Sequence, residues 1–198
     1  LLVGGVRSGV SQGLGVEVTA DSVVVRNDEN SALTGPELIL AARDEVTVAA
    51  GSVLRAKGEI AGGTGDLIMK PNVPEQLNDN GTSWDPSDDY VIPARDWGAL
   101  IRLSNGDAAK VVRSGVDTTV SYGTVDIGAG AVLAGGKALI IDATRNTIVA
   151  GSAQVSGRSI ALGGSRIGFG GGSEGLVFDV DALARFAAGS KQTPEALD

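Results

Sequence analysis

The chain has 198 residues, of which 42% are hydrophobic but only 4% aromatic, and its 30 glycines favour short strands and tight turns over a compact enzyme. A formal net charge of −8 argues against nucleic acid or an anionic membrane surface as a partner. The absence of cysteine and histidine excludes the common zinc sites and any thiol or imidazole chemistry. No apolar run approaches the roughly 18 residues of a membrane-spanning helix, so we expect no membrane insertion.

Residues 1–70 contain short apolar alternations separated by Gly, Asn, Asp or Ser. Val23 with Val25, and Val46 with Val48, are examples of the period of two that indicates a strand with one buried face. The stretch VTVAAGSVLRAKG begins at Val46 and has near-copies further along the chain. A short phrase that recurs in this way predicts a structure built by stacking.

The copies align on Gly51, Gly130 and Gly151, which gives offsets of 79 and 21 residues. A unit of about 20 residues therefore recurs with variation. Since such short strands cannot bury a face alone, we expect each strand to pair in parallel with its counterpart one coil later. The glycine would lie at a corner, where the backbone needs a positive φ or has no room for a Cβ atom.

This stacking predicts an all-β solenoid, a β-helix with coils of about 20 residues. Val48, Ile127 and Ile148 would then point inward and stack on like residues of neighbouring coils. The alternative is an antiparallel sandwich, whose short strands also recur every 8–12 residues or so. The solenoid is favoured because sandwich strands do not copy one another's sequence.

Residues 71–97 differ from the rest and predict a long insertion loop that leaves one coil and returns to it. This segment holds four of the six prolines, both tryptophans, and six acidic residues against one arginine. Insertions in solenoids map to loops and often form the binding face, whereas tryptophans can also simply pin a loop to the shaft. The candidate binding residues of this loop are Trp84, Tyr90, Trp97, Asp85, Asp88 and Asp89.

Carboxylates in this loop also suggest two other chemistries. Asp85, Asp88, Asp89 and Asp96 are candidates for the paired carboxylates of a glycoside hydrolase or lyase, although a solvated acidic loop explains them more simply. Residues 78–89 carry oxygen ligands of the kind that calcium prefers, but their spacing does not fit an EF-hand. We therefore expect no dedicated metal site and no cofactor, with adventitious calcium left open.

Residues 98–178 return to the coil pattern, and residues 179–198 leave it again. Asp179 is a candidate N-cap, Gly189 a candidate stop, and the apolar residues between them share one helical face. This predicts a short C-terminal helix, Asp179–Gly189, followed by a tail. The glycine-rich stretch 170–175 fits both G-x-S-x-G and G-x-G-x-x-G, but it lacks the histidine of the first motif and the βαβ context of the second.

The runs at Gly98–Gly115 and Gly123–Gly171, with ADSVVVRND and GPELILAARDEVTVAAGSVLRAKGEI before them, resemble the repeat region of filamentous-haemagglutinin-like exoproteins of Gram-negative bacteria. The resemblance covers most of the chain apart from residues 71–97 and the last dozen. It implies a right-handed parallel β-helix, export through an outer-membrane two-partner transporter, and a secreted or cell-surface location. The chain is then expected to be a piece of the shaft of a longer adhesin.

The sequence thus predicts a structural shaft segment that is not an enzyme and that binds a host-surface or glycan ligand through residues 71–97. The alternative is a carbohydrate-active β-helix, a polysaccharide lyase or glycoside hydrolase, that works through carboxylates and arginine. A catalytic β-helix would line a groove with aromatic and basic side chains, and the repeats contain few aromatics.

Overall fold

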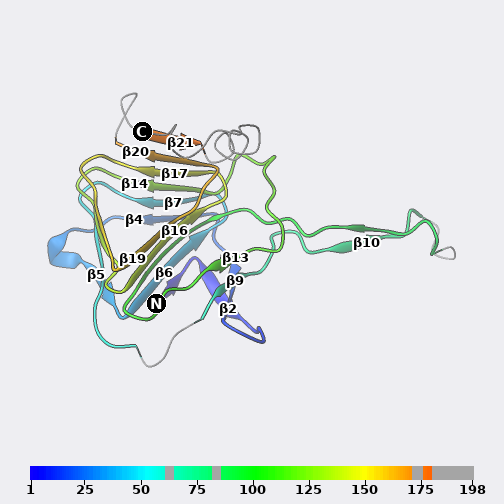
Figure 1. The fold of residues 1–198 in the computed structure, drawn as a ribbon, viewed down its shortest axis with the longest axis horizontal. Helices are drawn as coiled ribbons and strands as arrows, with labels where there is room; N and C mark the ends of the chain where they lie inside the picture. The colour runs from blue at the N-terminus through cyan, green and yellow to red at the C-terminus, as the bar shows by residue number, and fades with distance from the viewer. Residues whose placement is uncertain (61–64, 82–85, 171–175, 180–198) are drawn as a thin grey trace, which may run out of the picture.

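The computed structural model describes residues 1–60, 65–81 and 86–170, together with the backbone of 176–179. This part of the chain is all-β, as the sequence predicts, and contains no α-helix; a 3-10 turn at Glu29–Ser31 is capped by the Asp28 side chain. Figure 1 shows a body of stacked strands and a long hairpin that projects from it. The predicted helix lies outside the described residues except for Asp179, which ends a strand instead of capping a helix.

Three sheets enclose the interior of the body, and we name them by size and place. The six-stranded sheet contains, in spatial order, β4 (Ser22–Val25), β7 (Glu45–Val48), β14 (Thr124–Ile127), β17 (Asn146–Val149), β20 (Arg166–Phe169) and β21 (Leu176–Asp179). The corner sheet contains β5 (Leu33–Gly35), β8 (Val53–Ala56), β15 (Val132–Ala134) and β18 (Gln154–Ser156). The five-stranded sheet contains β1 (Leu2–Val3), β6 (Glu37–Ala42), β12 (Ala99–Ser104), β16 (Ala138–Ala143) and β19 (Ser159–Leu162).

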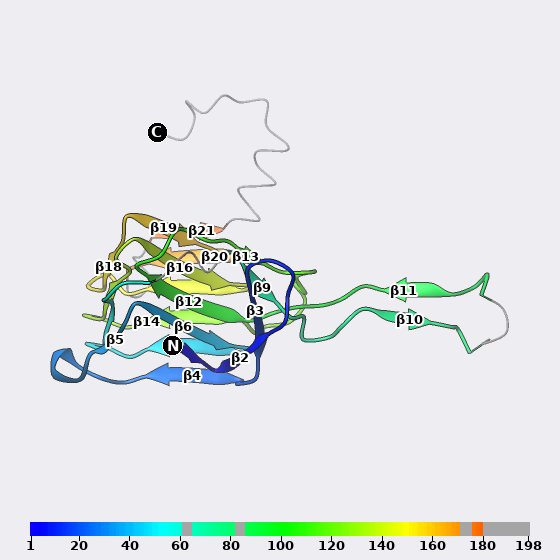
Figure 2. The same ribbon diagram turned by 90° about the horizontal axis from the view of Figure 1, so that it is seen from below.

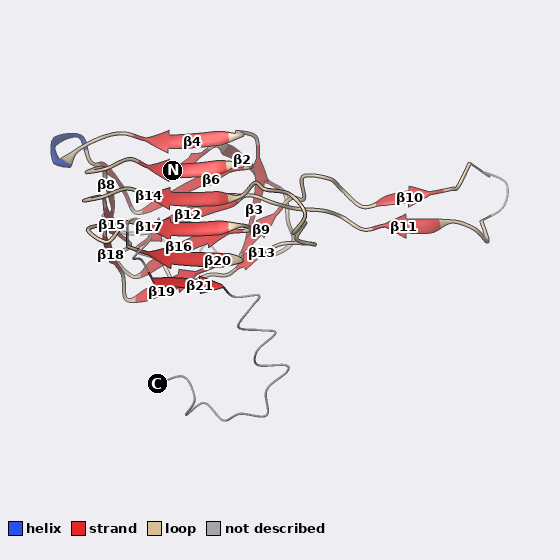
Figure 3. Ribbon diagram, turned by 90° about the horizontal axis from the view of Figure 1, so that it is seen from above, coloured by secondary structure: helices blue, strands red, loops and turns tan. Residues whose placement is uncertain are grey.

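The chain passes through these sheets in a fixed order, from the six-stranded sheet to the corner sheet to the five-stranded sheet. It does so in β4–β5–β6, again in β14–β15–β16, and again in β17–β18–β19. In the corner sheet and, apart from β21, in the six-stranded sheet, each strand pairs in parallel with its counterpart one passage later, as for β7 with β14 and β14 with β17. The strands of one sheet therefore lie one above another, as Figure 3 shows for the body.

The predicted offset of 79 residues is the spacing at which β7 pairs with β14 and β8 pairs with β15. Val46 pairs with Val125 in the six-stranded sheet, and Val53 pairs with Val132 in the corner sheet. Like residues thus stack on like residues, because equal positions of successive passages occupy equal positions on the sheet.

The second predicted offset is wrong by one residue in the six-stranded and corner sheets, where Thr124 pairs with Asn146 at a spacing of 22. In the five-stranded sheet, Ala138 pairs with Ser159 at the predicted spacing of 21. A slip of one residue moves a side chain to the other face of a strand. Ile148 was predicted to point inward with Val48 and Ile127; these two are fully buried, but Ile148 is 43% exposed. Thr147 and Val149 take the inward positions instead.

The predicted corner conformation is present at two of the three aligned glycines. Gly51 and Gly130 have φ angles of +72° and +69°, so the predicted corner conformation is present at both. A Cβ atom added to Gly51 would have no atom within 4 Å of it, which means that the positive φ and not crowding requires glycine there. Neither Gly151 nor Ser152, the counterpart of Gly130 in the true register, has a positive φ, so this corner conformation is not repeated in the third copy.

β12 breaks the parallel pattern of the five-stranded sheet, and β21 does so at the edge of the six-stranded sheet, where it pairs antiparallel with β20. β12 lies between β6 and β16 and pairs antiparallel with both, so that Leu103 stands between Leu38 and Leu139. The chain returns from the projecting hairpin at the carboxyl ends of the two neighbouring strands, where Ala99 meets Ala42 and Ala143. The chain can therefore form a strand between β6 and β16 only in the antiparallel direction.

The inner strands of the five-stranded sheet, β6, β12 and most of β16, are buried on both faces, whereas the edge strand β19 is largely exposed. One face joins the other two sheets in the inner core, which includes Leu38, Ile101, Val125, Leu133 and Ile141. The opposite face packs under a further sheet, here named the covering sheet, which forms a second core. The covering sheet contains, in spatial order, β13 (Val111–Val112), β9 (Leu67–Met69), β3 (Leu14–Val18) and β2 (Gly5–Ser8).

This covering sheet was not expected, because residues 1–70 were predicted to form coils only. It explains why β6 and β12 are buried at every position and do not alternate. A buried ion pair lies at this interface: the Arg102 guanidinium, fully buried, donates from Nε to Glu37 Oε1 at 2.8 Å and from Nη2 to Ser104 Oγ at 3.1 Å.

Candidate functional site

Residues 71–97, predicted as an insertion loop, form a projecting hairpin. Its strands are β10 (Gln76–Asn78) and β11 (Tyr90–Ile92), which pair antiparallel with Leu77 opposite Val91. Figures 2 and 3 show that both strands lie well outside the stacked body. Nearer the body, Val73 and Arg95 exchange two backbone hydrogen bonds of 2.9 Å, so the two arms stay together down to the base.

The structure brings only part of the predicted site together. Tyr90 is 52% exposed on the hairpin, where its hydroxyl accepts a hydrogen bond from Asn78 Nδ2 at 2.8 Å. Asp88 and Asp89 are half-buried next to it, and Asp88 accepts a bond from Asn80 Nδ2 at 3.3 Å. Trp84 and Asp85 lie outside the described residues.

Trp97 does not belong to this outer group, because it lies at the base of the hairpin. Its carbonyl accepts a hydrogen bond from Asn72 Nδ2 at 2.7 Å, which joins the two arms where they leave the body. Its indole Nε1 is buried and has no hydrogen-bond partner among the described residues. Trp97 therefore fits the alternative in which a tryptophan pins the segment to the shaft.

A buried ion cluster holds the base of the hairpin to the body. Arg113 Nη1 donates to Asp96 Oδ2 at 2.7 Å, and Arg113 Nη2 donates to Asp142 Oδ1 at 2.7 Å. Asp96 follows the hairpin, Arg113 follows β13 of the covering sheet, and Asp142 lies in β16. Three separate parts of the chain thus meet at one guanidinium, whose side chain is only 6% exposed.

The electrostatics of this cluster follow from burial. Burial raises the pKa of Asp96, against the opposing effect of the Arg113 guanidinium. Burial would lower the pKa of Arg113, but the carboxylates of Asp142 and Asp96 outweigh it and raise that pKa. The arginine therefore stays charged and paired on both sides, which is the arrangement of a structural anchor.

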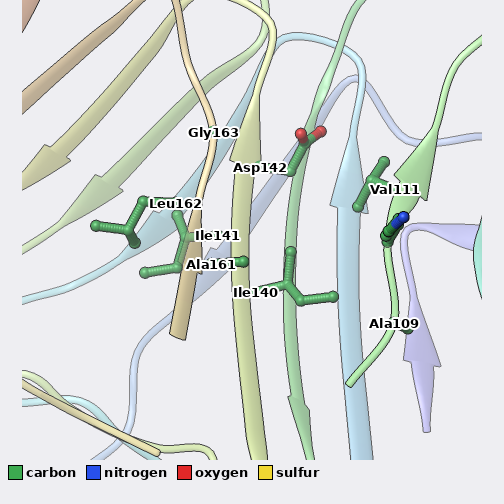
Figure 4. Close-up of a pocket in the computed structure, with 9 residues that line it drawn as sticks. Ala109, Val111, Ile140, Ile141, Asp142, Ala161, Leu162 and Gly163 are labelled. Atoms are coloured by element: carbon green, nitrogen blue, oxygen red, sulfur yellow. The ribbon is translucent and has the colours of Figure 1, made fainter. Parts of the chain in front are cut away.

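Two clefts lie beside Asp142 on the face of the five-stranded sheet that the covering sheet leaves open. The first, of about 210 Å³, is lined by Ala109, Lys110, Val111, Ile140, Ile141, Asp142, Ala161, Leu162 and Gly163. Figure 4 shows the Asp142 carboxyl group between the strand that carries Ile140 and the segment that carries Val111. The second, of about 280 Å³, includes Arg113, Thr118, Asp142, Thr144 and Ser165 in its lining.

This arrangement does not provide a pair of carboxylates on either side of a substrate. Asp142 keeps 24% of its side chain exposed, but Asp96 is only 2% exposed and faces the guanidinium. Among the described residues, no group of three or more Asp or Glu side chains is arranged to hold a metal ion. The clefts therefore share one accessible carboxylate, with a mostly apolar lining in the first and a largely polar lining in the second.

From the sequence, Asp96 was expected only as a catalytic carboxylate, and Arg113 and Asp142 were missed. A signal for Asp142 was present, since ELILAA and ALIIDA occupy equivalent positions and Asp142 stands where the earlier copy has Ala41. A carboxylate in an otherwise apolar strand requires a buried partner. The sequence does not reveal that Arg113 is this partner.

In comparisons with known proteins, no family model, curated protein or solved structure matches the chain. No helix in the described part of the chain is both long enough and apolar enough to cross a membrane.

Proposed function

We propose that this chain is a shaft segment of a large secreted bacterial adhesin, and that its body is a right-handed parallel β-helix. The observation that carries the proposal is the in-register parallel pairing of equivalent strands in two sheets, with spacings of 79 and 22 residues. A stack of this kind gains length with every added coil while each coil contacts only its neighbours. Such a design is suited to holding a binding element at a distance.

In this proposal the projecting hairpin is the element that is held out, and it contacts a host-surface or glycan ligand. The base of the hairpin is fixed by the Arg113 cluster and by the Asn72–Trp97 hydrogen bond, so the body supplies a rigid support. The full-length protein would leave the cell through an outer-membrane two-partner transporter. Export in an unfolded state is compatible with the lack of cysteine.

The experiment that tests this proposal is antibody labelling of intact cells of the organism that makes the chain, and of its culture medium. We expect labelling of intact cells or of the medium, and loss of the cell signal after external protease treatment. Labelling that appears only after cell lysis would overturn the proposal.

The carbohydrate-active alternative is separated from this proposal by an enzymatic assay. The purified chain is incubated with a panel of polysaccharides, and newly formed reducing or unsaturated ends are measured. A shaft segment binds without producing new ends, whereas a hydrolase or lyase produces them. The activity of an Asp142→Asn variant would then identify whether the accessible carboxylate of the clefts takes part.

A further inference from the structure

The projecting hairpin exposes an aliphatic pair that nothing described in the body covers. Leu77 is 66% exposed and Val91, directly opposite it, is 55% exposed. A two-stranded hairpin without a third strand or a packed face is at best marginally stable in water. An uncovered aliphatic pair at the end of such a projection is typical of a surface that docks on another molecule.

The two faces of the hairpin differ in chemistry. Leu77 and Val91 are directly paired and share one face of the hairpin, and three acidic residues, Glu75, Asp79 and Asp89, flank the two strands along the chain. Tyr90 lies on the opposite face, with its hydroxyl bonded to Asn78. The Leu77–Val91 face is therefore an apolar spot with a negatively charged border.

The edges of the hairpin are less suited to docking than this face. Pro74 precedes β10 and Pro93 follows β11, and proline has no N–H group for a new strand to bond. Docking through added strands is thus limited to the few residues between the prolines. The side-chain face carries no such restriction.

We infer that the Leu77–Val91 face docks on a folded protein partner whose surface presents an apolar patch bordered by lysine or arginine. This inference deepens the proposed binding role of the hairpin and rests on it. A protein fits better than a glycan because two aliphatic side chains offer neither hydrogen bonds nor a flat aromatic ring for a sugar. The border of carboxylates selects a basic partner and repels an acidic one.

The test uses the full chain and a short, fluorescently labelled peptide of alternating lysine and leucine, with binding followed by anisotropy. We expect the wild-type protein to bind this peptide. The affinity of Leu77→Ser/Val91→Ser should be at least about tenfold lower. Binding should also weaken between about 50 mM and about 300 mM salt. The matched control Gln76→Ser, on the opposite face, should bind as the wild type does.

Two further peptides separate the two parts of the inference. An alternating lysine–serine peptide, which lacks apolar side chains, and an alternating glutamate–leucine peptide, which reverses the charge, should each bind about tenfold more weakly. Equal binding of all three peptides, equal binding by the double serine variant, or no binding by the wild type would overturn the inference.

Far-UV circular dichroism of each variant shows whether the body is intact, because the hairpin contributes little of the β signal. Failure of peptide binding with an intact β signal overturns the docking inference and leaves the shaft proposal standing. Failure of the shaft proposal appears instead in the labelling of intact cells, which does not depend on the peptide.

Discussion

The stacked body and the projecting hairpin are built from the same kind of strand, but they are stabilised in different ways. In the body, β6 and β12 are buried at all six positions because sheets lie on both sides of them. In the hairpin, β10 and β11 have only each other, and Leu77, Tyr90 and Val91 are more than half exposed. The body is therefore stabilised by its own buried cores, whereas the position of the hairpin depends on the contacts at its base.

The largest expected effect lies in the body, where register decides which side chains are buried. Ile127→Asn should lower the free energy of unfolding by about 4 kcal/mol, because it removes a fully buried side chain and buries an unpaired amide. Ile148→Asn, the same change on the outer face one passage later, should cost less than about 1 kcal/mol. Urea unfolding of both variants measures the difference, and equal costs would mean that the 22-residue register is wrong.

An effect of similar size is expected at the interface between the five-stranded and covering sheets. Arg102→Met leaves the Glu37 carboxylate buried without its guanidinium and should cost about 3–5 kcal/mol. Arg102→Met/Glu37→Gln, which also removes the buried negative charge, should recover a large part of that loss. Chemical denaturation of the two variants side by side tests this, and no recovery in the double variant would show that packing of the arginine stem matters more than charge.

The ion cluster that joins hairpin and body should give a pH-dependent effect. Burial raises the pKa of Asp96 above its ordinary value of 3.8, so the folded chain binds this proton more tightly than the unfolded chain does. Relative to Asp96→Asn, the wild type should therefore lose stability as the pH rises from below 3.8 through the raised pKa of the folded state. Above that pKa the difference in stability between the two proteins should stay constant. Unfolding of both proteins between about pH 3 and pH 7 checks the sign. If the stability of the wild type instead increases relative to the variant as the pH rises, attraction to Arg113 has a larger effect on the pKa of Asp96 than burial has.

The smallest effect is expected in the hairpin itself. Replacing residues 75–93 by a short Gly-Ser turn keeps the Val73–Arg95 bridge and should change the free energy of unfolding by less than about 1 kcal/mol. Removing all of 71–97 is a different experiment, because it also deletes Asp96 and its bond to Arg113. Thermal unfolding of the two deletions compares them, and equal melting temperatures would mean that the cluster does not anchor the body.

The sequence alone determined the all-β class, the parallel pairing at an offset of 79 residues, and the corner conformation of Gly51 and Gly130. These features are local or repeated, and a pattern with a period of two or a repeated phrase records them directly in the order of residues. Prolines and acidic residues do not suit a buried strand, so residues 71–97 were predicted as a loop, and the pairing of β10 with β11 was not predicted.

Only the tertiary structure decided the rest. The spacing of 22 residues pairs the Gly130 position with Ser152 and not with Gly151, which a match on glycines cannot detect, and it places Ile148 outward. The antiparallel direction of β12 depends on the end of the sheet at which the chain returns. The meeting of Asp96, Arg113 and Asp142 depends on three segments that pack together only after the sheets have formed. Contacts between residues far apart in the chain leave no period in the sequence, so packing alone decides them.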